Sequence, residues 1–205
     1  MQVLSEKYTE EELLKKLRKK LDERRYIHSI GVAHTAVSLM MAHGSAQRSE
    51  DKGLFELQAA YTAGLLHDCA KCLEEEERDR LCKKYRVELS PMEQEHPFLI
   101  HAKLGAVLAK EKYGVTDPQI LSAIRYHTTG KAYMTLLEAI IFSADFIEPN
   151  RKMLDCLPEI RTEIYKDLPK AVYMILKQTM IHLELREQPV DEHSLEALEY
   201  YKQFA

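Results

Sequence analysis

The chain has 205 residues, of which 45% are hydrophobic and 30% charged, the balance of an ordinary globular protein. This length suggests one domain, and roughly 70% of the unfolded chain's surface can be buried on folding. The net charge of −4 argues against a dedicated nucleic-acid-binding protein, because such proteins normally carry a basic face. A few local cations can still serve a small anionic substrate.

The sequence pattern predicts neither a signal peptide nor a membrane-spanning helix. The segment Met1–Lys7 leads into a charged stretch without an apolar run of signal-peptide length. No segment approaches the ~18 apolar residues of a membrane helix. We therefore expect a cytoplasmic protein with neither membrane nor nucleic acid as a partner, and its four cysteines as reduced thiols.

The first three predicted elements are helices. Thr9 and Glu12 form a capping box, and leucines then recur every four residues at 13, 17 and 21. A second helix is expected from about Arg25 to Ala42, with Gly44 as a left-handed C-cap. A third begins at Ser49 and ends near residues 66–68. Its inward-facing residues are expected to be Leu54, Leu57, Tyr61, Gly64 and Leu65.

The sequence pattern in the middle of the chain predicts four more helices. The charged stretch from Glu74 to Lys84 is typical of a solvated helix with a thin apolar stripe. Ser90–Glu93 combines a cap pattern with proline at the first helical position. A helix over 99–112 stops at Gly114, and another runs from Asp117–Pro118 to about Thr129–Gly130.

Three further helices complete the pattern. Thr135 and Glu138 form a second capping box before a helix over 139–146 that Pro149 ends. Two more are expected at about 167–187 and 191–204. With no alternating strand or repeat, the sequence predicts an all-α helical bundle of roughly nine or ten helices. Residues 1–150 would form the core, and residues 151–205 a helical extension packed on it.

Chemistry concentrates in five segments that place a histidine or aspartate on, or at the end of, a predicted helix. They are 25–28, 66–71, 100–103, 125–128 and 144–148. One buried histidine is normally a hydrogen-bonded core or capping residue, but five such segments in one small domain favour a shared metal site. Adjacent residues such as His67 and Asp68 point about 100° apart on a helix, so both reach one ion most easily where the helix ends.

The order His28, His67–Asp68, Asp145 resembles the H…HD…D pattern of the HD-domain metal-dependent phosphohydrolases. The segments RYIHSIGV, GLLHDCAK, IHAKLGA, AIRYHTTG and MTLLEAIIFSADFIEPNR are similar to the YqeK-type members. These are the symmetrical bis(5′-nucleosyl)-tetraphosphatases, which split diadenosine tetraphosphate into two ADP through a metal-activated water. The resemblance covers about residues 10–190, and Phe146 stands where a tyrosine is more usual.

The resemblance implies two divalent transition-metal ions, iron first and Mn, Co or Zn as alternatives. The implied ligands, with Asp68 as the bridge, are His28, His67, Asp68, His101, His127 and Asp145. Catalytic roles are implied for Asp68, His67 and Lys71. Nucleotide contacts are implied for the ligands His28, Asp68, His101, His127 and Asp145, together with Arg25, Lys71, Thr128 and Arg151.

Two other functions remain open: another HD nucleotidase or phosphodiesterase, and a nucleotide-sensing module with little catalysis. A competent residue at every matched position favours an enzyme. The residues alone leave open the metal, the base preference, the symmetric cut, a homodimer and the co-purification of ADP or GDP. His96 is a second-rank candidate for a substrate contact, and Cys69 and Cys72 are interpreted as incidental core or boundary residues.

Overall fold

The computed structural model describes residues 2–44 and 49–205, and within these ranges all regular structure is helical. The predicted all-α fold is confirmed. The elements are α1 (Glu10–Arg18), α2 (Glu23–His43), α3 (Glu50–Leu66), α4 (Glu75–Tyr85), α5 (Pro91–Glu95), η1 (Pro97–Leu99), α6 (Ile100–Glu111), α7 (Pro118–Tyr126), α8 (Leu136–Ile147), α9 (Leu157–Glu163), α10 (Leu168–Leu185), α11 (Glu192–Tyr201) and η2 (Lys202–Phe204).

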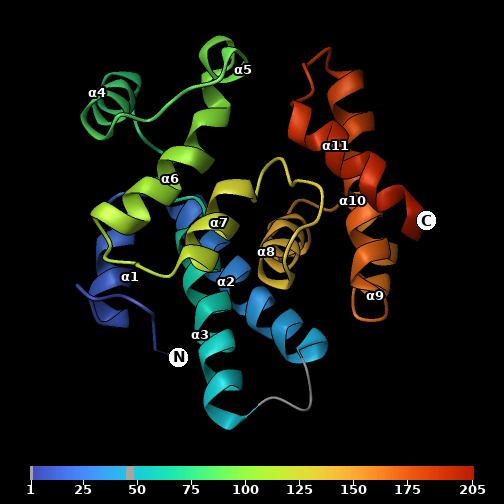
Figure 1. The fold of residues 1–205 in the computed structure, drawn as a ribbon, viewed down its shortest axis with the longest axis horizontal. Coiled ribbons are helices and arrows are strands. Elements are labelled where there is room, and N and C mark those ends of the chain that lie inside the picture. Colours follow the sequence, from blue (N-terminus) through green and yellow to red (C-terminus); the bar gives the residue numbers. More distant parts are fainter. Residues whose placement is uncertain (1, 45–48) are drawn as a thin grey trace.

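Helices α2, α3, α7 and α8 pack against one another at the centre of the molecule (Figure 1). Helix α6 packs on α7, while α10 packs on α8 and carries α9 and α11 on its other sides. Fully buried side chains such as Leu39, Leu65, Ile124 and Ile140 fill the space between the central helices. Among the described residues, no helix combines the length and apolar character needed to cross a lipid bilayer.

Helices α2 and α3 approach closely because Gly64 has no side chain. A Cβ atom added there would lie 2.7 Å from the Cα atom of Ala33, so a larger residue would force the two backbones apart. The close approach brings the first turns of α2 beside the end of α3. Both ends contribute to the candidate site.

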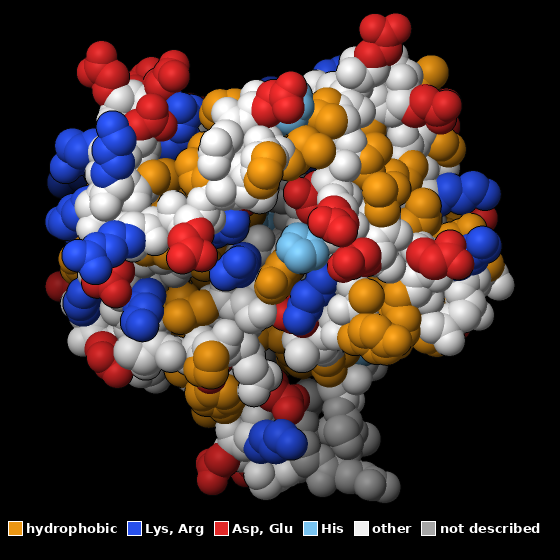
Figure 2. All heavy atoms as spheres, turned by 45° about the horizontal axis from the view of Figure 1, so that its top comes forward, with side chains coloured by type: hydrophobic (Ala, Val, Ile, Leu, Met, Phe, Trp, Pro, Cys, Tyr) orange, Lys and Arg blue, Asp and Glu red, His pale blue; other side chains and the backbone are white. Residues whose placement is uncertain are grey.

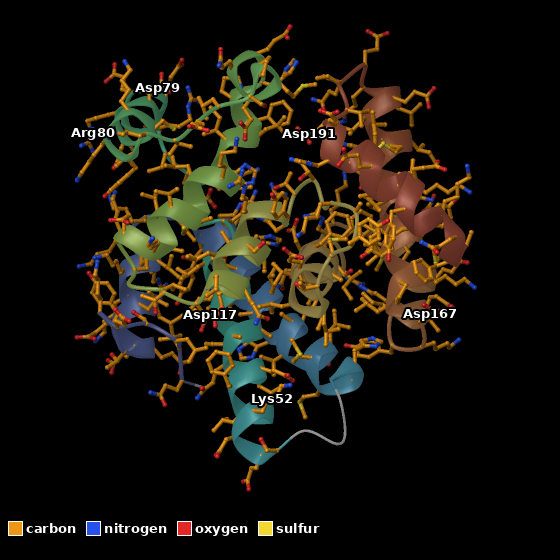
Figure 3. All side chains as sticks on the ribbon, viewed as in Figure 1. Lys52, Asp79, Arg80, Asp117, Asp167 and Asp191 are labelled. Carbon is orange, nitrogen blue, oxygen red and sulfur yellow. The ribbon has the colours of Figure 1, made fainter. Side chains whose placement is uncertain are left out.

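Most predicted helix starts are confirmed. Capping boxes begin α1 at Thr9, α5 at Ser90 and α8 at Thr135. Aspartate side chains cap α7, α10 and α11 at positions 117, 167 and 191 (Figure 3). In each case a side-chain oxygen accepts from a backbone N–H that has no partner within its own helix.

Two details of the prediction are wrong. Gly44 has φ −66° and ψ 151°, so the chain leaves α2 in an extended conformation and not through a left-handed cap. Leu54 is 52% exposed, because the first turns of α3 project beyond the helices that pack on its other end (Figure 1). The structure also adds α9, a short helix that the sequence pattern did not indicate.

The buried carboxylate of Glu138 is held by hydrogen bonds inside the helical bundle. Its buried carboxylate accepts from Ser122 at 2.5 Å and pairs with Lys131 at 3.0 Å. Burial by itself raises the pKa of Glu138, but hydrogen bonds from Ser122, Thr135 and Lys131 outweigh it and lower the pKa below 4.5. The stability that the ionised form contributes is therefore complete above about pH 4.5, and it is lost as pH falls through the lower folded-state pKa.

We expect Glu138→Gln to lower the free energy of unfolding by about 1–3 kcal/mol at pH 7. Urea unfolding at a series of pH values would measure this difference. The difference should shrink as pH falls below about 4.5. A difference that stays constant across the acidic range would contradict the assignment.

Candidate functional site

The six side chains predicted as metal ligands converge on one point between the central helices. His28 lies on α2, His67 and Asp68 directly follow α3, and Asp145 lies near the end of α8. His101 lies in the first turn of α6, and His127 directly follows α7. Five of them are buried, and the Asp145 side chain is 21% exposed.

The His67–Asp68 doublet lies where α3 stops. The last α3 residue is Leu66, so both side chains leave the helix at its end and point to the same centre. The Nε2 atom of His67 lies 3.4 Å from Oδ2 of Asp68. This is the local geometry that the sequence argument required for adjacent residues to share one site.

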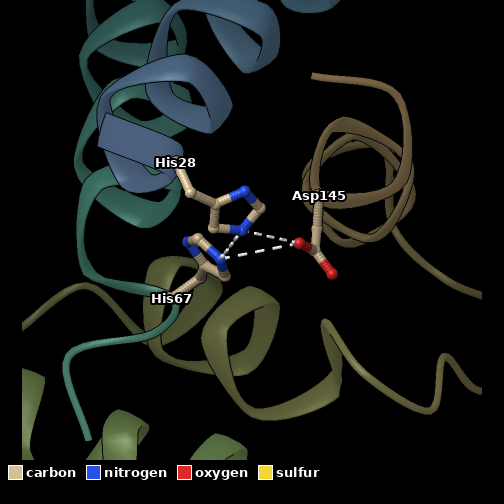
Figure 4. A group of neighbouring side chains, drawn as sticks. All are labelled: His28, His67 and Asp145. Atoms are coloured by element: carbon tan, nitrogen blue, oxygen red, sulfur yellow. Dashed lines mark hydrogen bonds and ion pairs between the residues drawn. The ribbon is translucent and has the colours of Figure 1, made fainter. Parts of the chain in front are cut away.

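One side of the cluster consists of His28, His67 and Asp145 (Figure 4). Oδ1 of Asp145 lies 2.9 Å from Nε2 of His28 and 3.8 Å from Nε2 of His67. The two Nε2 atoms lie 3.3 Å apart. Two imidazole nitrogens and a carboxylate oxygen at these separations form a donor set suited to a divalent transition metal.

The other side is centred on Asp68, whose Oδ1 atom lies 3.4 Å from Nε2 of His101 and 3.5 Å from Nε2 of His127. This Oδ1 atom is buried and has no hydrogen-bond partner among the described residues. An unpartnered carboxylate oxygen in the interior is unfavourable. A cation would satisfy it, so the residues fit a metal at this position.

Three of the four imidazoles are oriented by the same local contact. The Nδ1 atoms of His67, His101 and His127 donate to backbone carbonyls three residues earlier, at 2.7, 2.6 and 2.7 Å. A carbonyl only accepts, so Nδ1 carries a hydrogen, and in the neutral ring the lone pair then lies on Nε2. Each neutral ring therefore presents its Nε2 lone pair to the centre, the state that metal coordination requires.

His28 is oriented by a residue to which sequence reasoning gave no role. Its Nδ1 atom donates to Oε1 of Glu148 at 3.0 Å, and the Glu148 side chain is 1% exposed. The backbone N–H of Asn150 donates to the other Glu148 oxygen at 2.7 Å. A usable signal existed, because Glu148 directly follows α8 and lies only three residues after Asp145.

Electrostatics keep the carboxylates charged. Burial by itself raises the pKa of Asp68, but the imidazoles of His67 and His127 outweigh it and hold the pKa well below its usual value. Burial and then the ammonium of Lys71 lower the pKa of His101 to about 3, which leaves that ring neutral at pH 7. Burial alone would lower the pKa of His28, yet Asp145 and Glu148 raise it.

Four predicted substrate-contact residues adjoin this cluster. A guanidinium nitrogen of Arg25 lies 2.5 Å from Oδ2 of Asp68, and one of Arg151 lies 3.4 Å from Oδ1 of Asp145. Nζ of Lys71 lies 3.1 Å from Nε2 of His101, and burial lowers the lysine pKa. The Thr128 hydroxyl lies 3.2 and 3.1 Å from Nε2 of His101 and His127.

A cavity of about 460 Å³, here called the α8–α10 cavity, opens onto the cluster. Its polar lining includes His127, Asp145 and Arg151 on the side of the cluster. Its apolar wall includes Phe142, Phe146, Ile175 and Ile181. A pocket with mainly apolar walls and a few convergent charged groups is the usual form of a small-molecule site.

Other singled-out residues lie elsewhere. His96 ends α5, where its ring lies 6.0 Å from that of Phe98. Cys69 is buried with its thiol against the Gly105 carbonyl, and burial raises the thiol pKa to about 12. Cys72 instead contacts Asp22 at 3.4 Å. The two thiols therefore face different partners.

Comparisons with known proteins identify the family. Residues 25–150 match the model of the HD domain family. The chain is 37% identical to the symmetrical bis(5′-nucleosyl)-tetraphosphatase of Bacillus subtilis (strain 168), over 88% of this chain and 90% of that protein. It is 38% identical to the protein of the same name from Halalkalibacterium halodurans, over 83% of this chain and 84% of that one.

A solved structure has the same fold. It is a predicted HD superfamily hydrolase involved in NAD metabolism from Clostridium acetobutylicum, with a TM-score of 0.86 and 33% sequence identity. The superposition covers 97% of this chain and 99% of that one. The likeness therefore extends over the C-terminal helices as well as the core.

Proposed function

Because the chain belongs to the HD domain family, we propose that it hydrolyses dinucleoside tetraphosphates symmetrically, releasing two nucleoside diphosphates. The relatives that match most of its length carry that activity in their names. The observation that carries the proposal is the buried Asp68 carboxylate, whose unpartnered Oδ1 atom faces two Nε2 atoms beside a nucleotide-sized cavity. Diadenosine tetraphosphate is the proposed substrate.

The proposed cofactor is a pair of divalent transition-metal ions, with iron first and Mn, Co or Zn as alternatives. His28, His67 and Asp145 would hold one ion, and His101 and His127 the other, with Asp68 between them. Such a pair, when bound, lowers the pKa of a water molecule and offsets the negative charge of a phosphate. The proposed ligand set is the six-residue cluster described above.

The other polar residues act on the substrate. Arg151 can offer two parallel N–H donors to phosphate oxygens, and its guanidinium lies 5.8 Å from the ring centre of Phe146. Lys71 adds a positive charge beside His101, and Thr128 adds a hydroxyl donor. Arg25 holds Oδ2 of Asp68 and so keeps that carboxylate in place. The apolar wall of the α8–α10 cavity would exclude water from the nucleoside.

The two parts of the chain would have different roles. We propose that residues 1–150 form the metal-binding core and that residues 151–205 complete the substrate cavity, because Ile175 and Ile181 of α10 line it. The cytoplasmic location, a homodimer and the co-purification of ADP or GDP remain predictions from the sequence.

Glu148→Gln is expected to weaken metal binding by about 10–100-fold, the usual effect of removing the partner that orients a ligand histidine. Dialysis against a metal buffer, followed by elemental analysis, would measure it. Glu138→Gln is the matched control, a buried carboxylate at the other end of α8. It should lower stability without changing metal affinity, and equal metal affinity in both variants would argue against the orienting role of Glu148.

Comparison of substrates distinguishes the proposed activity from the other HD functions. The metal-loaded protein is incubated with diadenosine tetraphosphate, AMP and a cyclic nucleotide, and kcat/KM is measured for each. We expect the tetraphosphate to be strongly preferred. A preference for AMP indicates a nucleotidase, and a preference for the cyclic nucleotide indicates a phosphodiesterase. Tight nucleotide binding without turnover indicates a sensor.

A further inference from the structure

A second cavity, of about 430 Å³, shares Thr128 as a lining residue with the α8–α10 cavity. It is here called the α6–α11 cavity, because α6 with the residues before it forms one wall and the start of α11 forms the other. Figure 2 views this face, where the surface is hollowed between two lobes. We propose that this cavity binds the second nucleoside of the substrate, an inference that rests on the proposed function.

The two cavities are similar in size and share a lining residue. Their volumes are nearly equal, each falls in the range of small-molecule sites, and Thr128 lines both. The Thr128 hydroxyl also contacts His101 and His127. The candidate metal centre therefore lies at the junction between two similar cavities, as a substrate with two identical ends requires.

The walls of the α6–α11 cavity carry groups that suit a base and a phosphate. Tyr126 and His193 place their rings 5.6 Å apart at 86° in the α6–α11 cavity, which offers an aromatic face to a base. The guanidinium of Arg125 lies 5.5 Å from the Tyr126 ring centre, and among the described residues it has no acidic partner. It is thus available to a phosphate oxygen.

Two of the three acidic residues that line the cavity, Asp191 and Glu192, lie at the α11 end, and the third, Glu93, pairs with Lys103 on the other wall. Asp191 begins α11 and lies on the side that faces α5 and α6 (Figure 3). Carboxylates there suit the amino hydrogens of a base and not a phosphate. The Ser194 hydroxyl donates to the Thr129 carbonyl at 2.9 Å, which fixes the start of α11 against the turn that carries Thr128. The second wall is therefore tied to the candidate metal centre.

Two nucleoside cavities would determine where the tetraphosphate is cut. With one nucleoside in each cavity, the middle of the phosphate chain lies at the junction. The water oxygen bonds to an inner phosphorus, and the bond from that phosphorus to the central bridging oxygen breaks. One water is consumed and two ADP are formed. The symmetric cut then follows from the two cavities.

Counting bound ADP tests the proposal independently of turnover. Equilibrium dialysis of the metal-loaded protein should give two ADP per chain for the wild type and one for Arg125→Ala/His193→Ala. Glu196→Ala is the matched control, because it removes the exposed His193–Glu196 pair without touching the cavity, and it should still bind two. One ADP in the wild type, or two in the double variant, would overturn the proposal.

Kinetics give a second readout. The double variant should raise KM for diadenosine tetraphosphate by roughly tenfold or more, the effect of losing one base stack. Its kcat/KM for adenosine 5′-tetraphosphate, which has one nucleoside, should fall by much less, because that substrate loses only the phosphate contact of Arg125 and no base stack. An equal loss on both substrates contradicts a second nucleoside site. If the wild type does not hydrolyse diadenosine tetraphosphate, the proposed function fails, while the ADP count still tests the cavity.

Discussion

Asp68→Ala should bind less than one metal ion per chain and lose turnover by at least about 10²–10³-fold, the scale of removing one group that stabilises the transition state. The reason is its central position: Oδ1 lies within 3.5 Å of two imidazole nitrogens, and Oδ2 lies 3.4 Å from a third. Elemental analysis and initial rates with diadenosine tetraphosphate would measure both losses.

The same variant should remain folded. In the presence of a chelator, removal of the carboxylate leaves Arg25 and the neighbouring imidazoles without their anionic partner, so the melting temperature should fall. The hydrophobic core is untouched, so a cooperative unfolding transition should persist. With metal added, only the wild type should gain stability, because a ligand stabilises only the state that binds it. Full metal content and normal turnover in Asp68→Ala would contradict the bridging role.

Arg151→Ala should lower kcat/KM by roughly 10²-fold while metal content stays unchanged. Its guanidinium contacts Asp145 from the α8–α10 cavity, and the side chain is 36% exposed, so it can reach a phosphate from that side. Steady-state kinetics with elemental analysis of the same samples would test this.

Arg151→Lys is the matched control, because it keeps the charge but removes the two-pronged guanidinium. It should recover only part of the lost activity, since lysine donates to phosphate from a single point. Loss of metal from Arg151→Ala would contradict the assignment. It would mean that Arg151 supports Asp145 and does not contact the substrate.

The sequence predicted the helices best where side chains cap them. Thr9, Ser90 and Thr135 act locally, within three residues, so their capping boxes could be read directly. The predicted left-handed C-cap at Gly44 was wrong because glycine adopts extended and left-handed conformations with similar ease. The exposure of Leu54 depends on how far α3 extends past its neighbours, which no local pattern contains.

The sequence predicted the residues of the candidate site, but not the residue that orients His28 or the second cavity beside the site. The six converging side chains come from five helices or the residues directly after them, and their order along the chain carried the resemblance to a known family. Glu148 was missed because Pro149 drew attention to the helix end and not to the carboxylate beside it. The α6–α11 cavity was also missed, because Tyr126 and His193 meet only through the packing of distant helices.

The most direct test of the proposed function is the product analysis of a single reaction. Protein of measured metal content is incubated with diadenosine tetraphosphate, and the products are separated by anion exchange. We predict ADP as the only product, two for each substrate consumed, with no product after chelation or in Asp68→Ala. AMP together with ATP, or no turnover by fully metal-loaded protein, would contradict the proposal.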